Sequence, residues 1–132
     1  MNPENVLAEF ERAKKALRAA QVLHAGGLLE DAASRSYYAV MHAAKAALLV
    51  HDAIAESHAA VRRLFGAVLV RPGLVEEEWA SVLAKEQDRR IAADYDVGVA
   101  WESEAVSRLI EEAGAFVQRI QNYLVDAGVS VG

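Results

Sequence analysis

Apolar residues recur along this chain at steps of three and four, the spacing that lines one face of an α-helix. The clearest stripe comprises Val106, Leu109, Ala113, Phe116, Ile120 and Tyr123. Another stripe begins at Val6 and runs to Ala20, and the Gly26–Gly27 pair ends that helix. No segment shows the alternation of apolar and polar residues that a half-buried strand requires. The pattern therefore predicts an all-α protein.

Three further helices are expected between these two. One runs from about Leu29 to Val50 and is apolar on more than one side, so we expect it at the centre or at an interface. A shorter helix covers about Ser57 to Val70, and a longer one covers about Val75 to Tyr95. After a short connection at 96–100, Ser103 begins the last helix. We therefore predict an antiparallel up-and-down bundle of four long helices with one shorter helix.

The length of 132 residues suits a single domain, which we expect over residues 1–126. The Ala-Gly pair at 127–128 closes the last helix and predicts a disordered tail over 127–132. No run approaches the ~20 apolar residues of a membrane span, so no membrane association is expected. The chain has no cysteine, which excludes disulfides, thiolate metal sites and cysteine nucleophiles. The cytoplasm is the expected compartment.

Charge and motifs narrow the classes of function. Nineteen acidic and fourteen basic residues give a net charge of −5. General DNA binding depends on clustered Lys and Arg, so this balance argues against it, although a local basic patch is compatible with any net charge. The histidines, His24, His42, His51 and His58, have no second histidine three or four residues away. With no glycine-rich phosphate loop either, we expect neither a metal site nor a cofactor.

The second helix contains the most informative stretch, SRSYYAVMHAAKAALL at residues 34–49. It places Tyr37, Tyr38 and His42 within two turns of an alanine-rich helix. This stretch resembles the YYA-x-x-H-A-A pattern of the second helix in the HEPN family (higher eukaryotes and prokaryotes nucleotide-binding domain).

Two later blocks extend the resemblance in the same order. SHAAVRRLFG at 57–66 is similar to the family's histidine followed by a helix ending in Phe-Gly. DRRIAADYD at 88–96 is similar to the family's R-x-x-A-D-Y block. The resemblance covers about residues 7–125, and three ordered blocks make it specific.

The resemblance implies an antiparallel helical bundle that often dimerises and belongs to prokaryotic toxin–antitoxin pairs. The partner in such pairs is commonly a minimal nucleotidyltransferase. Many members of the family are metal-independent endoribonucleases, in which an arginine is followed, after four to six residues, by a histidine. That chemistry needs a cation for the developing phosphorane charge and a group that moves a proton near neutral pH.

The sequence departs from this catalytic motif. From the arginine pair at 89–90 the histidine would fall at 94–97, which hold Asp94, Tyr95, Asp96 and Val97. No histidine follows His58. Aspartate repels a phosphate, and a tyrosine hydroxyl, with an unperturbed pKa of about 10, is a poor proton carrier at pH 7. The resemblance therefore implies the family's fold and partners but not its usual ribonuclease site.

We expect the second and fourth helices to form a polar seam that binds a partner or a phosphate-bearing ligand. The candidate residues are Tyr37, Tyr38, His42, Arg90, Asp94 and Tyr95. The alternative for Arg90 and Asp94 is an intrahelical ion pair worth only ~0.2–0.5 kcal/mol. The alternative for the two tyrosines is core packing. Arg35 and His42, seven residues apart on nearly one helix face, are the fallback catalytic pair.

Three hypotheses follow. The first is a binding module, a homodimer that pairs with a minimal nucleotidyltransferase and binds a nucleotide or RNA without efficient chemistry. The second is a metal-independent endoribonuclease toxin that uses Arg35 with His42, or Arg90 with Tyr95. The third is a purely structural helical adaptor. The sequence does not name the ligand or decide between toxin and antitoxin.

Overall fold

The computed structural model describes residues 1–95, 98 and 100–131, and over these the chain is helical with no strand. The elements are α1 (Pro3–Ala25), α2 (Leu29–Leu49), α3 (His58–Leu64), the π-helical segment η1 (Phe65–Val70), α4 (Glu77–Tyr95) and α5 (Ser103–Asp126). The predicted all-α class, with four long helices and a shorter one, is confirmed. The connection predicted at 96–100 includes residues 96, 97 and 99, which lie outside the described residues.

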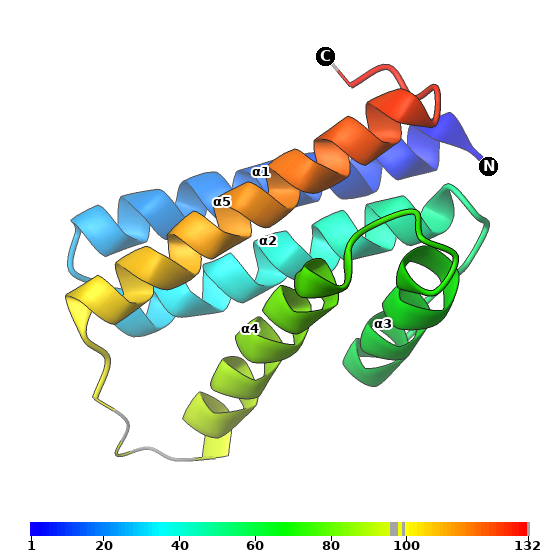
Figure 1. Ribbon diagram of the computed structural model, residues 1–132. Helices are drawn as coiled ribbons and strands as arrows, with labels where there is room; N and C mark the ends of the chain where they lie inside the picture. Colours follow the sequence, from blue (N-terminus) through cyan, green and yellow to red (C-terminus); the bar gives the residue numbers. More distant parts are fainter. Residues whose placement is uncertain (96–97, 99, 132) are drawn as a thin grey trace.

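Helix α2 lies at the centre of the fold. In Figure 1, α1 and α5 lie on one side of α2, and α3 and α4 lie on the other. Helix α2 contacts each of the other helices, and α1 packs against it along most of its length. The central position predicted for this helix is therefore confirmed, and it explains why its apolar residues occur on several sides.

Small side chains allow this close packing around α2. More than half of the residues that α2 buries between Ala32 and Leu48 are alanines, and alanine keeps neighbouring helix axes close. The facing stripe of α1 supplies Val6, Phe10 and Ala13, which are fully buried. The larger side chains of α5, including Phe116 and Ile120, fill the remaining space in the core. The sequence stripes therefore correspond to the buried faces.

Specific residues begin and end the helices. The Asn2 side chain accepts hydrogen bonds from the backbone N–H groups of Glu4 and Asn5, which caps α1. Gly27 has a φ of +79°, a conformation that glycine adopts without strain, and it turns the chain from α1 into α2. The Ser57 hydroxyl accepts from the backbone N–H of Ala60 and caps α3. These local signals fix where the chain reverses.

The segment predicted as one helix over Ser57–Val70 differs in detail. It is α-helical only to Leu64 and then continues as the π-helical η1. Phe65 and Leu69 remain fully buried through this change. The apolar stripe therefore predicted the buried face correctly, but the spacing of side chains does not distinguish an α-helix from a short π-helical continuation.

The chain continues beyond α5 along the core. Gly128 has a φ of +89°, and the backbone N–H of Val129 then bonds to the Leu124 carbonyl. Val129 is 3% exposed and packs with the main apolar core, although the sequence assigns it to a tail. Within the described ranges, no helix is both long enough and apolar enough to cross a membrane.

Candidate functional site

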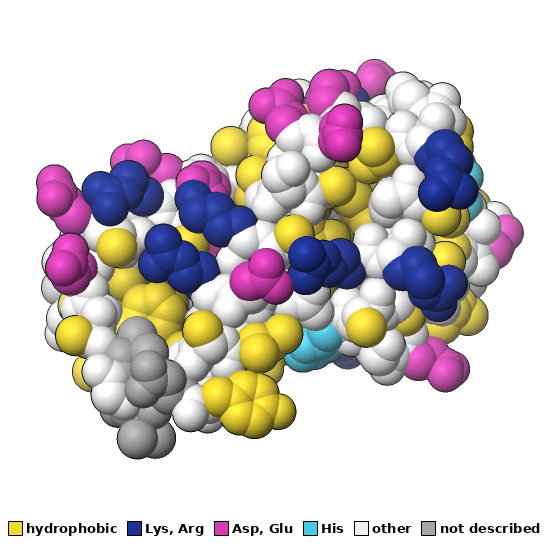
Figure 2. Space-filling model, turned by 60° about the horizontal axis from the view of Figure 1, so that its bottom comes forward, with side chains coloured by type: hydrophobic (Ala, Val, Ile, Leu, Met, Phe, Trp, Pro, Cys, Tyr) yellow, Lys and Arg dark blue, Asp and Glu magenta, His cyan; other side chains and the backbone are white. Residues whose placement is uncertain are grey.

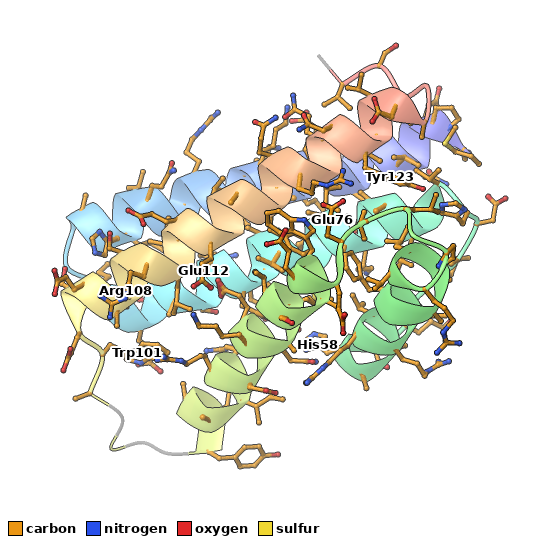
Figure 3. The ribbon with its side chains drawn as sticks, in the orientation of Figure 1. His58, Glu76, Trp101, Arg108, Glu112 and Tyr123 are labelled. Carbon is orange, nitrogen blue, oxygen red and sulfur yellow. The ribbon has the colours of Figure 1, made fainter. Side chains whose placement is uncertain are left out.

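The two neighbouring tyrosines of α2 have different surroundings. Tyr37 is 2% exposed, whereas Tyr38 is half-buried. The centroids of their rings are 5.6 Å apart, and the Tyr37 ring also lies 5.3 Å from the ring of His58. His58 begins α3 and lies on the side of that helix that faces α4 (Figure 3). The Tyr37 ring therefore contacts both Tyr38 and His58, the first residue of α3.

Tyr37 also responds to charges on α4. Burial raises the pKa of Tyr37 to about 12, assisted by Tyr38, while the charge of Arg90 and a hydrogen bond with Gln87 act in the opposite direction. The hydroxyl is therefore neutral at pH 7, and it donates to Sδ of Met41 at 3.6 Å. Of the predicted polar residues of α4, Arg90 lies close enough to Tyr37 for its charge to influence that hydroxyl. We call this region, made of Tyr37, Gln87 and Arg90, the α2–α4 seam.

The C-terminal part of α4 shows the simpler arrangement that the sequence also allowed. The Arg90 guanidinium lies 3.2 Å from the Asp94 carboxylate in an i, i+4 ion pair. The Asp94 side chain is 52% exposed, and Tyr95 is 88% exposed. The structure therefore places Arg90 at the seam, Asp94 beside it as its ion-pair partner, and Tyr95 in solvent rather than against the tyrosines of α2.

On the opposite side, α2 and α1 enclose an open groove of about 410 Å³. Arg35, Tyr38 and His42 line it from α2, and Arg12 and Lys15 line it from α1. Three of the predicted residues thus come together, but next to α1 instead of α4. We call this hollow the α1–α2 groove. Sequence reasoning missed Arg12 and Lys15, although their spacing of three residues places them on one face of α1.

His42 is held in place by a carboxylate from α1. Its Nδ1 lies 2.8 Å from Oε1 of Glu9, which is 9% exposed. Because a carboxylate only accepts hydrogen bonds, Nδ1 carries the hydrogen and donates it. The Lys45 ammonium and the Arg12 guanidinium are 3.6 Å and 3.8 Å from the same carboxylate. The fallback pair of Arg35 and His42 therefore shares one groove, with one imidazole nitrogen already engaged.

A buried carboxyl group that the sequence did not reveal lies between α2, α4 and α5. Glu86 is 1% exposed, with Oε1 at 3.0 Å from the Ser36 hydroxyl. The same hydroxyl lies 3.1 Å from the Leu109 carbonyl oxygen. Burial raises the pKa of Glu86 to about 8, and the nearby charge of Glu112 acts in the same direction.

The protonated form of Glu86 satisfies this cluster. Ser36 has one hydroxyl proton and cannot donate it to two acceptors. A protonated Glu86 donates to Ser36, which in turn donates to the Leu109 carbonyl. The sequence did contain a signal that Glu86 is buried. Its spacing from Leu83 and Ala93 places all three residues on the buried face of α4. The cluster holds α4 against the core, since each of its polar groups then has a partner.

The surface of α3 and α4 carries many charges of both signs. Figure 2 shows Lys and Arg side chains distributed over this surface beside acidic ones. The Arg62 guanidinium is 3.0 Å from the Asp88 carboxylate, and the Lys85 ammonium is 2.6 Å from Glu112. Over residues 1–95, 98 and 100–131, no group of three or more acidic or histidine side chains is arranged to hold a metal ion.

Comparison with known proteins identifies the family. The HEPN domain family matches residues 7–123. A Methanocaldococcus jannaschii protein named "putative toxin" is 39% identical over 121 residues, which cover 92% of this chain and 90% of the relative. A second "putative toxin" of that organism is 25% identical over 123 residues, covering 93% and 84% of the two chains. A UPF0332 protein of Gloeobacter violaceus is 31% identical over 116 residues, covering 87% and 92%. This chain therefore belongs to the HEPN family, as its three sequence blocks indicated.

Proposed function

We propose that this protein is a HEPN binding module of the toxin–antitoxin type. In this proposal it acts in the cytoplasm as a homodimer, pairs with a minimal nucleotidyltransferase, and binds a nucleotide or RNA without efficient chemistry of its own. The two relatives named "putative toxin" support the toxin–antitoxin assignment, because the similarity covers most of this chain and most of theirs.

The proposal rests on the kinds of polar residues found at the C-terminal end of α4 and on their surroundings. Arg90 is engaged by the carboxylate of Asp94, and the side chain of Tyr95 is turned to solvent. Metal-independent cleavage of a phosphodiester needs a group that takes up and gives back a proton near pH 7. Neither aspartate nor tyrosine meets this need in its unperturbed form. Binding without cleavage is the function that this arrangement supports.

The α2–α4 seam also supports a partner contact. Arg90 is partly exposed next to Tyr37, and on the same helix Ile91 and Tyr95 expose apolar surface, at 46% and 88%. Aromatic residues and arginine are enriched at the centres of protein interfaces. We place the contact with the nucleotidyltransferase at this end of α4.

The test is to search the neighbouring open reading frames for a minimal nucleotidyltransferase and to co-express it with this protein, followed by size-exclusion chromatography. A stable complex is expected for the unaltered protein and for Arg71→Ala, a matched change at an exposed arginine outside the seam. Arg90→Ala is expected to abolish the complex while the melting temperature stays nearly unchanged. Lack of a complex with the unaltered protein would refute the partner assignment, and a large loss of stability in Arg90→Ala would assign Arg90 a structural role.

One observation favours an endoribonuclease as the second candidate function. Arg35 and His42 line the same groove, and Glu9 orients the His42 ring as a third group orients a catalytic base. If purified protein cuts RNA in the presence of a chelator, and His42→Ala stops the cutting, this second function replaces the first. A structural adaptor, the third hypothesis, predicts no thermal shift with any nucleotide or RNA.

A further inference from the structure

The α1–α2 groove is cationic although the chain has a net charge of −5. Arg12, Lys15 and Arg35 line it, with the small side chains of Ala16 and Ala19 between them. None of the described residues that line it is acidic. A hollow lined by charges of one sign concentrates the electrostatic potential. The groove is therefore a place on this acidic protein where an anion is attracted.

The cations of the groove are not consumed by ion pairs. Within the described part of the chain, Lys15 and Arg35 form no salt bridge. Arg12 has only a 3.8 Å approach to Glu9, and its side chain is 68% exposed. On the α3–α4 surface, by comparison, Arg62 is paired with a carboxylate at 3.0 Å. The charges of the groove are thus free for a ligand.

The groove also contains two neighbouring aromatic rings. The rings of Tyr38 and His42 are stacked, with centroids 6.3 Å apart and planes inclined by 29°. The hydrogen bond to Glu9 fixes the orientation of the imidazole, so this ring is positioned before any ligand arrives. Aromatic rings beside a positive track are the arrangement with which proteins bind the bases and backbone of single-stranded nucleic acids.

We propose that the α1–α2 groove binds a nucleotide, with Arg12, Lys15 and Arg35 contacting phosphate oxygens and the Tyr38–His42 rings stacking on the base. The inference rests on the proposed function, since it assigns the surface that takes the ligand. The volume of about 410 Å³ falls in the usual range for small-molecule sites. A second hollow of about 350 Å³ shares Arg12 and is also lined by Lys45 and by Glu9, whose carboxylate lies 3.6 Å from the Lys45 ammonium.

The nucleotide can be free or part of a single-stranded RNA, since both present a phosphate and a base. The experiment therefore titrates the protein with ATP in one arm and with a fluorescently labelled short single-stranded RNA in the other. We expect binding of ATP or RNA, whichever the unaltered protein binds, to be weaker by about tenfold or more in the triple variant Arg12→Ala, Lys15→Ala, Arg35→Ala. In the RNA arm, the slope of log affinity against log salt should fall by about 2, which corresponds to three lost phosphate contacts.

A matched triple variant controls for charge alone. Arg63→Ala, Arg71→Ala and Arg108→Ala remove the same three charges from positions outside the groove, and this variant is expected to retain most of the affinity. Figure 3 shows Arg108 on α5. Tyr38→Leu should abolish the preference for ATP over inorganic pyrophosphate. Melting temperatures of the variants, measured in parallel, are expected to match that of the unaltered protein.

Each other result would overturn the inference. Equal losses in the two triple variants would mean that only general electrostatic attraction is involved. Binding of neither ATP nor RNA would refute the site, and capture of a poly-glutamate peptide alone would assign the groove to an acidic protein partner. Arg90→Ala is expected to leave nucleotide binding intact. Intact nucleotide binding without a nucleotidyltransferase complex would therefore refute the partner assignment and leave this inference standing.

Discussion

The two sides of α2 use polar residues in opposite ways. Toward α4, the buried Glu86 has a matched partner in the Ser36 hydroxyl. Toward α1, the cations Arg12 and Arg35 line an open groove without a carboxylate among its described lining residues. Buried polar groups that are hydrogen-bonded to each other determine how helices pack. Surface charges without an ion-pair partner remain able to attract a charged ligand. The α1 side of α2 also packs closely and contains the matched pair of His42 and Glu9, so the contrast concerns the groove cations alone.

The largest expected difference lies between the two adjacent tyrosines. Tyr37→Ala removes an almost fully buried aromatic side chain and should lower the free energy of unfolding by about 3–5 kcal/mol. Tyr38→Ala removes a half-buried ring and should cost clearly less stability while weakening nucleotide binding. Urea unfolding of both variants measures the difference. Equal losses of stability would contradict the assignment of Tyr37 to the core and of Tyr38 to the groove.

The next effect concerns pH and the buried Glu86. The folded protein keeps a proton on Glu86 up to about pH 8, whereas the unfolded chain releases it near the ordinary glutamate pKa of 4.5. Stability is therefore fully present below the unfolded pKa and is lost as the pH rises toward the folded pKa. The loss from this group between pH 5 and 8 is on the order of 3 kcal/mol.

Glu86→Gln replaces the acid with a neutral group of similar shape that can still donate to Ser36. The variant is expected to lose this decline in stability and to be more stable than the unaltered protein at pH 8. Glu78→Gln, a matched change at an exposed glutamate, should keep the decline. Urea unfolding at several pH values provides the comparison. A Glu86→Gln variant with an unchanged pH dependence would show that Glu86 is ionised in the folded protein.

The smallest effect is expected at the exposed ion pair before α4. The Arg119 guanidinium donates to both carboxylate oxygens of Glu76, and the Trp79 indole donates to one of them. The hydrogen bond from Arg119, followed by that from Trp79, lowers the pKa of Glu76 to about 2. Its stabilisation is therefore present above pH 4.5 and is lost as the pH falls toward 2. Because Glu76 is half exposed, Arg119→Ala should cost only about 0–1 kcal/mol at pH 7.

The sequence predicted the helices well because their apolar residues recur with helical spacing. It predicted the central position of the helix at Leu29–Val50 for the same reason, since only a helix contacted on several sides is apolar on several sides. It did not predict the π-helical η1, because the buried residues Phe65 and Leu69 fit either kind of helix. Local spacing determines which face is buried but not the hydrogen-bonding pattern of a short segment.

The candidate site was predicted only in part. The sequence grouped His42 and Tyr38 with Arg90, but the structure places the first two beside α1, with Tyr37 between them and α4. The contribution of Arg12 depends on how α1 is aligned against α2, which is a long-range property that no motif encodes. A single sequence therefore identifies the helix that carries the candidate residues, but it does not identify the neighbouring helix that completes the site.

The central claim is that this HEPN protein binds its ligand without cutting it. The most direct measurement is incubation of the purified protein with end-labelled single-stranded RNA in the presence of a chelator, with bound and cleaved RNA quantified in the same samples. The account predicts RNA that is bound by the unaltered protein, released by the groove triple variant, and intact in both cases. RNA that is cut by the unaltered protein and spared by His42→Ala or Arg90→Ala would contradict it.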